Sequence, residues 1–238
     1  MRCEHVTYFY PNGGEDFACR IWDDEVFVYR GYEHFGTYEL LREPFCHYCG
    51  YPGVKTENCN YHVGLYGFNR IYVMGEYSPR HRNLLSQHIL KLKSRIFYAK
   101  PLGCALACTI TNRYREVLKG DVLVPVPLHP TEYHERGFNQ SLELARIVGK
   151  YLNISVEHVL KKKRVERMKG KNREARSRAV RGLYSIISRR ENLVRNKYVV
   201  LIDDVITTGF TVSECSKVLR SNGADRVDVL GLARTVLI

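Results

Sequence analysis

A continuous apolar run near the end of the chain, followed at once by two carboxylates, most constrains the fold. Val199–Ile202 has the length of a strand and no polar alternation, as expected for a parallel strand covered on both faces. Asp203 and Asp204 follow, then hydroxyl residues, Gly209 and a stretch with apolar residues at helical spacing. Ligands of open parallel sheets bind at the carboxyl ends of strands, so the sequence predicts a site here.

Elements before this run alternate in the same way. Leu85–Ile96 and the stretch opened by Pro101 have apolar residues at helical spacing, Val122–Val124 is a short apolar strand, and Leu144–Tyr151 is again helical. Strand–helix alternation predicts an α/β domain with a doubly wound parallel sheet over residues 79–238. Residues 1–78 are rich in turn residues and strand-like runs, and are predicted to form a small β-rich N-terminal module.

The residues after the apolar run suit a phosphorylated sugar. A helix N-terminus offers unpaired N–H groups to an anion, and Thr207, Thr208 and Thr211 add hydroxyl donors. Glycine at position 209 allows a close approach of the backbone. The two adjacent carboxylates can accept hydrogen bonds from a sugar's vicinal hydroxyls or bind a hydrated metal.

The cysteines point to a metal site rather than to disulfides. The N-terminus lacks a signal-peptide pattern, so we expect a cytoplasmic protein with reduced thiols. Four residues have the spacing C-x2-C-x9-C-x2-H, which is compatible with a closed structural zinc site: Cys46, Cys49, Cys59 and His62. The alternative is that Cys3 or Cys19 completes the site in place of His62.

The positive charge is local. The formal net charge is +12, and Lys161–Arg181 contributes +9 of it. Such a segment indicates a polyanionic partner, which would be nucleic acid or a phosphate-rich small molecule. The alternative is that the segment is a solvated face with no partner. The longest apolar stretch, Leu102–Ile110, is shorter than the roughly 20 residues that span a bilayer, so no membrane partner is expected.

Two motifs resemble known families. Residues 199–211 resemble the 5-phosphoribosyl-1-pyrophosphate (PRPP) signature of type I phosphoribosyltransferases. Val124–Pro130, Glu135–Ser141 and Leu230–Thr235 are similar to the competence protein F (ComF) family within that superfamily. ComF relatives commonly carry a paired-cysteine zinc module before the transferase domain, which matches the knuckles at 46–62.

The resemblance implies a role for each matching residue. Asp203 and Asp204 would face the ribose, and the residues from Thr207 to Thr211 would grip the 5′-phosphate, with Phe210 standing where the family usually has a small residue. Arginines at matching positions would contact the diphosphate, which Mg²⁺ normally accompanies: Arg136, Arg173 and Arg176.

Two functions follow as hypotheses. The first is a phosphoribosyltransferase that displaces pyrophosphate from the anomeric carbon of PRPP. The alternative is a nucleic-acid-handling accessory protein of the DNA-uptake type, with little or no catalysis. Its pocket would bind phosphorylated ligands, and Lys161–Arg181 would bind DNA or a single-stranded nucleic acid.

Overall fold

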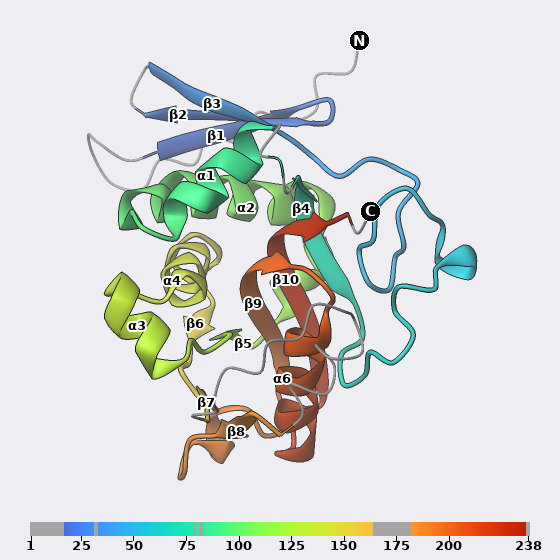
Figure 1. The fold of residues 1–238 in the computed structure, drawn as a ribbon, viewed down its shortest axis with the longest axis vertical. Helices are drawn as coiled ribbons and strands as arrows, with labels where there is room; N and C mark the ends of the chain where they lie inside the picture. The colour runs from blue at the N-terminus through green and yellow to red at the C-terminus, as the bar shows by residue number, and fades with distance from the viewer. Residues whose placement is uncertain (1–16, 31–32, 79, 81–82, 164–181, 237–238) are drawn as a thin grey trace.

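The centre of the molecule is a five-stranded parallel sheet. The computed structural model describes residues 17–30, 33–78, 80, 83–163 and 182–236. The strands lie in the order β4 (Ile71–Tyr77), β10 (Arg226–Thr235), β9 (Tyr198–Ile206), β5 (Val122–Pro125) and β6 (Ser155–Val156), and each neighbouring pair is parallel (Figure 1). The predicted α/β class with a parallel sheet is confirmed.

Both faces of this sheet are covered, as the uninterrupted apolar run requires. Val200 and Ile202 of β9 join a core that includes residues of α4 (Gln140–Leu152). Val199 and Leu201 join a second core with residues of α6 (Phe210–Ser221) on the opposite face. Because side chains alternate along a strand, every residue of the run is buried.

The remaining helices and strands build outward from these layers. α1 (Leu84–Leu92) and α2 (Ala99–Arg113) share the core on the α4 face of the sheet, and the antiparallel sheet of β1 (Phe17–Trp22), β2 (Glu25–Arg30) and β3 (Glu33–Glu39) packs against them (Figure 1). α3 (Pro130–Arg136) follows β5, and β7 (Leu160–Lys162) pairs with β8 (Tyr184–Ile186) near the start of α6. None of the helices in the described ranges is long and apolar enough to cross a membrane.

Two predicted helix bounds were wrong by a few residues. α1 ends at Leu92, and Ile96 lies in a separate 3-10 turn, because the chain turns at Lys93–Arg95 with hydrogen bonds back to Leu90 and Lys91. α2 begins at Ala99, so Pro101 lies inside its first turn, where its missing N–H has no helical partner to lose.

The first 78 residues contribute to three parts of the fold. β1–β3 share the core of α1 and α2, whereas Cys46, Cys49 and Cys59 belong to the core on the α6 face. β4 precedes the predicted boundary at residue 78, yet it is an edge strand of the central sheet and pairs with β10. The domain boundary at residue 78 remains a prediction, and β4, which precedes it, belongs to the central sheet.

Candidate phosphate and metal sites

The acidic pair lies within β9 rather than after it. The strand was predicted to end at Ile202, but Gly231–Arg234 of β10 pairs with Asp203–Ile206 and extends it by four residues. Asp203 and Asp204 are half-buried in this last part of the strand. They lie at the carboxyl edge of the sheet, where a parallel sheet presents its ligand site.

Asp203 joins β9 to the start of α4 at this edge. The hydroxyl of Ser141, in the first turn of α4, donates to Asp203 Oδ1 at 3.0 Å, and the N–H of Asp204 donates to the same oxygen at 3.0 Å. α4 leads from β5 to β6 on one side, and α6 leads from β9 to β10 on the other. The chain thus reverses its winding direction between β5 and β9, which is the position of a ligand crevice in doubly wound sheets.

Burial, and next the neighbouring Asp204 carboxylate, raises the pKa of Asp203 to about 8, against the opposing effect of the Ser141 hydrogen bond. A carboxyl group that resists ionisation is a common feature of functional sites. It also has a consequence for folding, since the unfolded chain releases this proton at a lower pH.

The thermal stability of the protein is therefore expected to decrease as pH rises from about 5 toward 8. The folded state holds the Asp203 proton in this window and the unfolded state does not, so the slope of unfolding free energy against pH is negative. Asp203→Asn should reduce that slope, as followed by calorimetric melting at fixed ionic strength. An equal slope in the parent and the variant would contradict the raised pKa.

The predicted phosphate loop is a short turn followed by the start of a helix. Thr207 is exposed and Thr208 is buried. Gly209 is the N-cap of α6 with φ of +84°, a left-handed conformation that favours glycine. Phe210 and Thr211, predicted as part of the loop, form the first residues of α6, and Phe210 is 8% exposed. The bulky side chain of Phe210 thus belongs to the core.

The four predicted metal ligands come together. One ligand atom from each of Cys46, Cys49, Cys59 and His62 lies within 4.8 Å of all the others. The Cys49 and Cys59 sulfurs are 3.7 Å apart, and Cys46 Sγ is 3.5 Å from His62 Nδ1. A tetrahedral zinc ion with bonds of about 2.0–2.3 Å needs ligand separations of about 3.5–3.8 Å, so the set fits a metal ion such as zinc.

Local geometry builds the first knuckle. The N–H of Gly50 donates to Cys46 O at 2.8 Å, and Gly50 has φ of +65°, which turns the chain back on itself. The N–H of Cys49 then points at Cys46 Sγ at 3.5 Å. The alternative with Cys19 is wrong in this structure, because Cys19 lies in the other core with its sulfur 3.0 Å from that of Cys104. Cys3 lies outside the described residues.

Comparison with known proteins agrees with this arrangement. The phosphoribosyl transferase domain family matches residues 139–234, from the N-cap of α4 to the end of β10. Competence protein F of Haemophilus influenzae is 27% identical over 197 residues, covering 79% of this chain and 84% of the relative. DNA utilization protein YhgH of Escherichia coli K12 is 30% identical over 173 residues, covering 71% of this chain and 74% of the relative. The chain belongs to the ComF family.

The ComF family belongs to the type I phosphoribosyltransferase superfamily. The range of this chain that matches the phosphoribosyl transferase domain includes the acidic pair and the turn before α6. Competence protein ComFC of Streptococcus pneumoniae is a further relative, 33% identical over 112 residues and 47% of each chain. The cysteine and histidine ligands precede the matched range, so they are an addition to the phosphoribosyl transferase domain.

The predicted arginines of this ComF chain are placed only in part. Arg136 lies in the last turn of α3, where its Nη2 is 3.9 Å from Glu132 Oε1. Glu132 also accepts an ion pair from Lys162 of β7 at 3.6 Å. Arg173 and Arg176 lie outside the described residues, as does all of the basic segment after Lys163.

Two residues of the site were not predicted from the sequence. Ser141 stands in the block after the Val122–Pro125 strand, and its contact with Asp203 depends on pairing between β5 and β9. Tyr184 of β8 is buried, its pKa is raised by burial, and β8 packs against α6. Neither contact leaves a signal in the local sequence.

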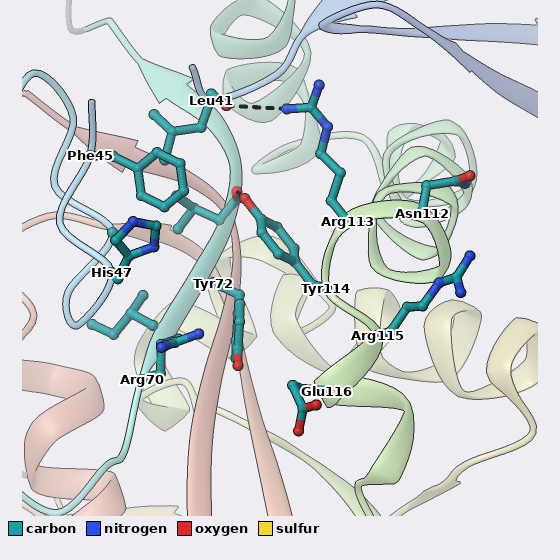
Figure 2. Close-up of a pocket in the computed structure, with 13 residues that line it drawn as sticks. Leu41, Phe45, His47, Arg70, Tyr72, Asn112, Arg113, Tyr114, Arg115 and Glu116 are labelled. Carbon is teal, nitrogen blue, oxygen red and sulfur yellow. Dashed lines mark hydrogen bonds between the residues drawn. The ribbon is translucent and has the colours of Figure 1, made fainter. Parts of the chain in front are cut away.

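A separate cavity of about 370 Å³ lies beside β4 and the end of α2, and none of the predicted site residues lines it (Figure 2). Arg113 is fixed there by Asp24 Oδ1 at 2.5 Å and by the carbonyl of Leu41 at 3.3 Å. Tyr114 donates its hydroxyl to Val73 O at 2.8 Å. These bonds join α2 to the segment after β3 and to β4, which is a structural role.

Proposed function

We propose that this ComF protein binds PRPP or a closely related phosphorylated ribose at the carboxyl ends of β9 and β5. The observation that carries the proposal is the Asp203–Ser141 contact at the switch point, directly before the turn that opens α6. The match to the phosphoribosyl transferase domain supports it.

Each group of the site has a task in this proposal. Asp203 and Asp204 accept hydrogen bonds from the ribose hydroxyls, and the turn from Thr207 to Gly209 with the first N–H groups of α6 binds the 5′-phosphate. Arg136, with Arg173 and Arg176 of the basic segment, contacts the diphosphate. Carboxylate oxygens are also the ligands that Mg²⁺ takes, and the ion brings neutralising charge to the diphosphate.

The reaction that this arrangement supports is displacement of pyrophosphate from the anomeric carbon. The bond from this carbon to the diphosphate oxygen breaks as a nucleophile bonds to the carbon, and positive charge develops on the ribose. A carboxylate beside the ring can stabilise that charge, a role that we assign to Asp204, because the raised pKa of Asp203 keeps that group protonated at neutral pH. Calorimetric titration of the full chain with PRPP and Mg²⁺ tests binding: saturable 1:1 binding supports the site, and absence of both heat and thermal shift contradicts it.

The metal site is proposed to hold one structural zinc ion, because four protein ligands leave no open position. The seven cysteines in the described ranges form no disulfide, as expected if the protein works in the reducing cytoplasm.

Purified protein is expected to contain about one zinc per chain by elemental analysis, since the four ligands match a closed site. Cys59→Ser and His62→Ala should each lower the zinc content strongly. Cys19→Ala is the matched control and should retain it, because Cys19 lies beside Cys104 instead. Full zinc in both ligand variants would contradict the assignment.

A second candidate function is the handling of single-stranded DNA through Lys161–Arg181. Two observations favour it: the net charge of +9 in this segment and the names of the relatives, a competence protein and a DNA utilization protein. In the described part of the segment, Lys161 and Lys163 are exposed, whereas Lys162 is paired with Glu132.

Salt dependence separates the two uses of the segment. If it binds a DNA backbone, log affinity should fall with log salt at a slope of about −0.7 to −0.9 per phosphate contacted, and alanine at Lys161 to Lys163 should reduce the slope. If it covers the diphosphate, alanine at Lys171, Arg173 and Arg176 should weaken PRPP binding most. If both variants bind PRPP and DNA as the parent does, the segment is only a solvated face with no part in binding.

A further inference from the structure

Arg234 of β10 is the largest fully buried side chain of the described residues, at 0% exposure. Its Nη1 donates to the carbonyl of Ile206 at 3.0 Å and also to the carbonyl of Thr207. These two residues form the junction between β9 and the turn proposed to bind the 5′-phosphate. One guanidinium therefore fixes the start of that turn.

The same guanidinium reaches the metal cluster. Its carbon lies 5.6 Å from the centre of the ring of Tyr51, two residues after the metal ligand Cys49. Tyr51 in turn holds the first knuckle, because its carbonyl accepts the Cys46 N–H at 2.8 Å. Arg234 thus lies against a residue of the first knuckle on one side and contacts the phosphate turn on the other.

Charge balance explains why the arginine is tolerated there. A buried guanidinium needs a counter-charge, and no carboxylate within the described residues makes an ion pair with Arg234. Three thiolates, one neutral imidazole and a divalent ion carry a net charge of −1. The loaded cluster would therefore balance one arginine.

A second set of contacts also joins the region of the metal ligands to the turn before α6. The segment after His62 packs on the start of α6, where Tyr66 N–H donates to Ser213 Oγ at 2.8 Å and Ser213 Oγ donates to Tyr66 O at 2.9 Å. Leu65 lies so close to Gly209 that a Cβ added there would be 2.8 Å from Leu65 Cδ1. The metal ligands and the turn are therefore parts of one packed unit.

We propose that Arg234 is a positioning residue that couples metal occupancy of the Cys46, Cys49, Cys59 and His62 site to the geometry of the turn from Thr207 to Gly209. The metal-free protein then holds its phosphorylated ligand weakly, although no ligand touches the metal. The ligand part of this inference rests on the proposed function, whereas the coupling of metal to turn does not.

Hydrogen exchange on the full chain tests the coupling without any ligand. Chelator-treated protein is expected to exchange the amides of residues 206–209 faster than zinc-loaded protein, while the amides of Val200–Ile202 remain protected in both. Equal exchange at residues 206–209 with and without zinc would overturn the proposal, whatever the outcome of PRPP titrations.

A thermodynamic cycle tests the role of Arg234. In the parent, zinc removal should weaken PRPP binding about 5- to 150-fold, the usual range of coupling between two binding sites. Arg234→Gln should show weak binding already, with little further effect of zinc removal, because the connection is lost. Effects that simply multiply would show that Arg234 and zinc act independently and would overturn the assignment.

Arg220→Gln is the matched control. This arginine also donates to two carbonyls, those of Ala224 and Asp225, but it is exposed at the far end of α6. Zinc removal should weaken PRPP binding by Arg220→Gln as much as it weakens PRPP binding by the parent. If Arg234→Gln does not fold, Co²⁺-loaded parent and Arg234→Lys decide: the cobalt–thiolate absorption should shift between them, since the contact of the planar guanidinium with Tyr51 beside the knuckle is lost. Identical spectra would overturn the proposal.

Discussion

Replacing both site carboxylates by amides, in Asp203→Asn with Asp204→Asn, is expected to weaken PRPP binding by at least about 100-fold. Each hydrogen bond between a ribose hydroxyl and a site carboxyl contributes about 0.5–1.5 kcal/mol, or about 1.5–3 kcal/mol where that carboxyl is ionised, and 1.4 kcal/mol is a factor of ten in affinity. The amide oxygen at position 203 can still accept from Ser141 and from the Asp204 N–H, so the fold should persist.

Calorimetric titration with Mg²⁺ present measures this effect, and circular dichroism verifies the fold. Glu116→Gln is a suitable control, because Glu116 forms an exposed pair with Lys119 at 3.1 Å on a distant 3-10 turn. Unchanged affinity in the double variant would remove the acidic pair from the ligand site.

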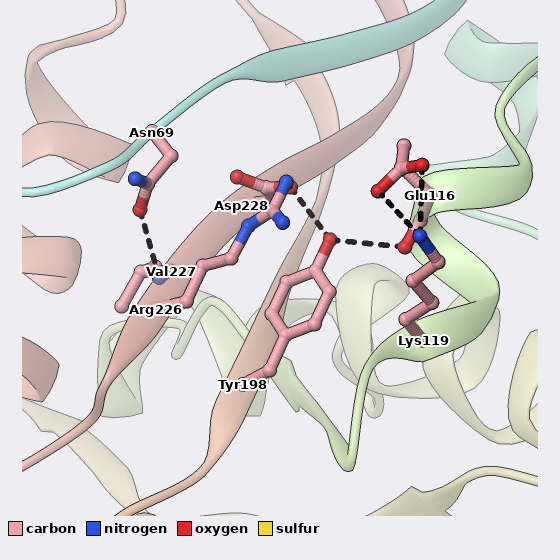
Figure 3. Close-up of polar contacts among 7 residues, drawn as sticks. All are labelled: Asn69, Glu116, Lys119, Tyr198, Arg226, Val227 and Asp228. Carbon is pink, nitrogen blue, oxygen red and sulfur yellow. Dashed lines mark hydrogen bonds and ion pairs between the residues drawn. The ribbon is translucent and has the colours of Figure 1, made fainter.

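The largest effect on stability is expected from Asp228→Ala, at the amino end of β10. Asp228 is fully buried, accepts the Tyr198 hydroxyl at 2.6 Å and pairs with Arg226 at 2.8 Å (Figure 3). The substitution takes one acceptor from the Tyr198 hydroxyl and the counter-charge from Arg226, whose side chain is 36% exposed, so a loss of about 2–3 kcal/mol is expected. For a chain of this size the melting temperature should fall by roughly 5–10 °C.

PRPP affinity should be retained in this variant, because Asp228 pairs with Val200 in register, well before Asp203 on β9. Breaking the exposed Glu116–Lys119 pair should cost less than about 1 kcal/mol by the same melting assay. A similar loss in both variants would mean that burial does not distinguish the two pairs.

The sequence was sufficient for elements whose pattern is local. The uninterrupted run at Val199–Ile202 predicted a strand buried on both faces, and the spacing of three cysteines and a histidine predicted a cluster that the structure assembles. In both cases the residues that determine the feature are close in the sequence, so the pattern contains the needed information.

Features that depend on distant pairing were missed. The strand continues past Asp203 because β10 pairs with it, and β4 joins the central sheet because its partner lies about 150 residues later. Ser141 and Arg234 acquire their roles from contacts with β9 and with the metal cluster, which no local spacing encodes. Cys19 could not be separated from the metal ligands by spacing alone, since only the packing beside Cys104 removes it.

The pairing of β4 with β10 has a consequence for the order of synthesis. Ribosomes add about 5–20 residues per second, so roughly 10–30 seconds pass between the emergence of Ile71–Tyr77 and that of Arg226–Thr235. During this interval a strand with five buried residues has no sheet to join. The nascent chain therefore exposes an aggregation-prone segment until its last strand is made, and we expect its yield in cells to depend on chaperones that cover such segments.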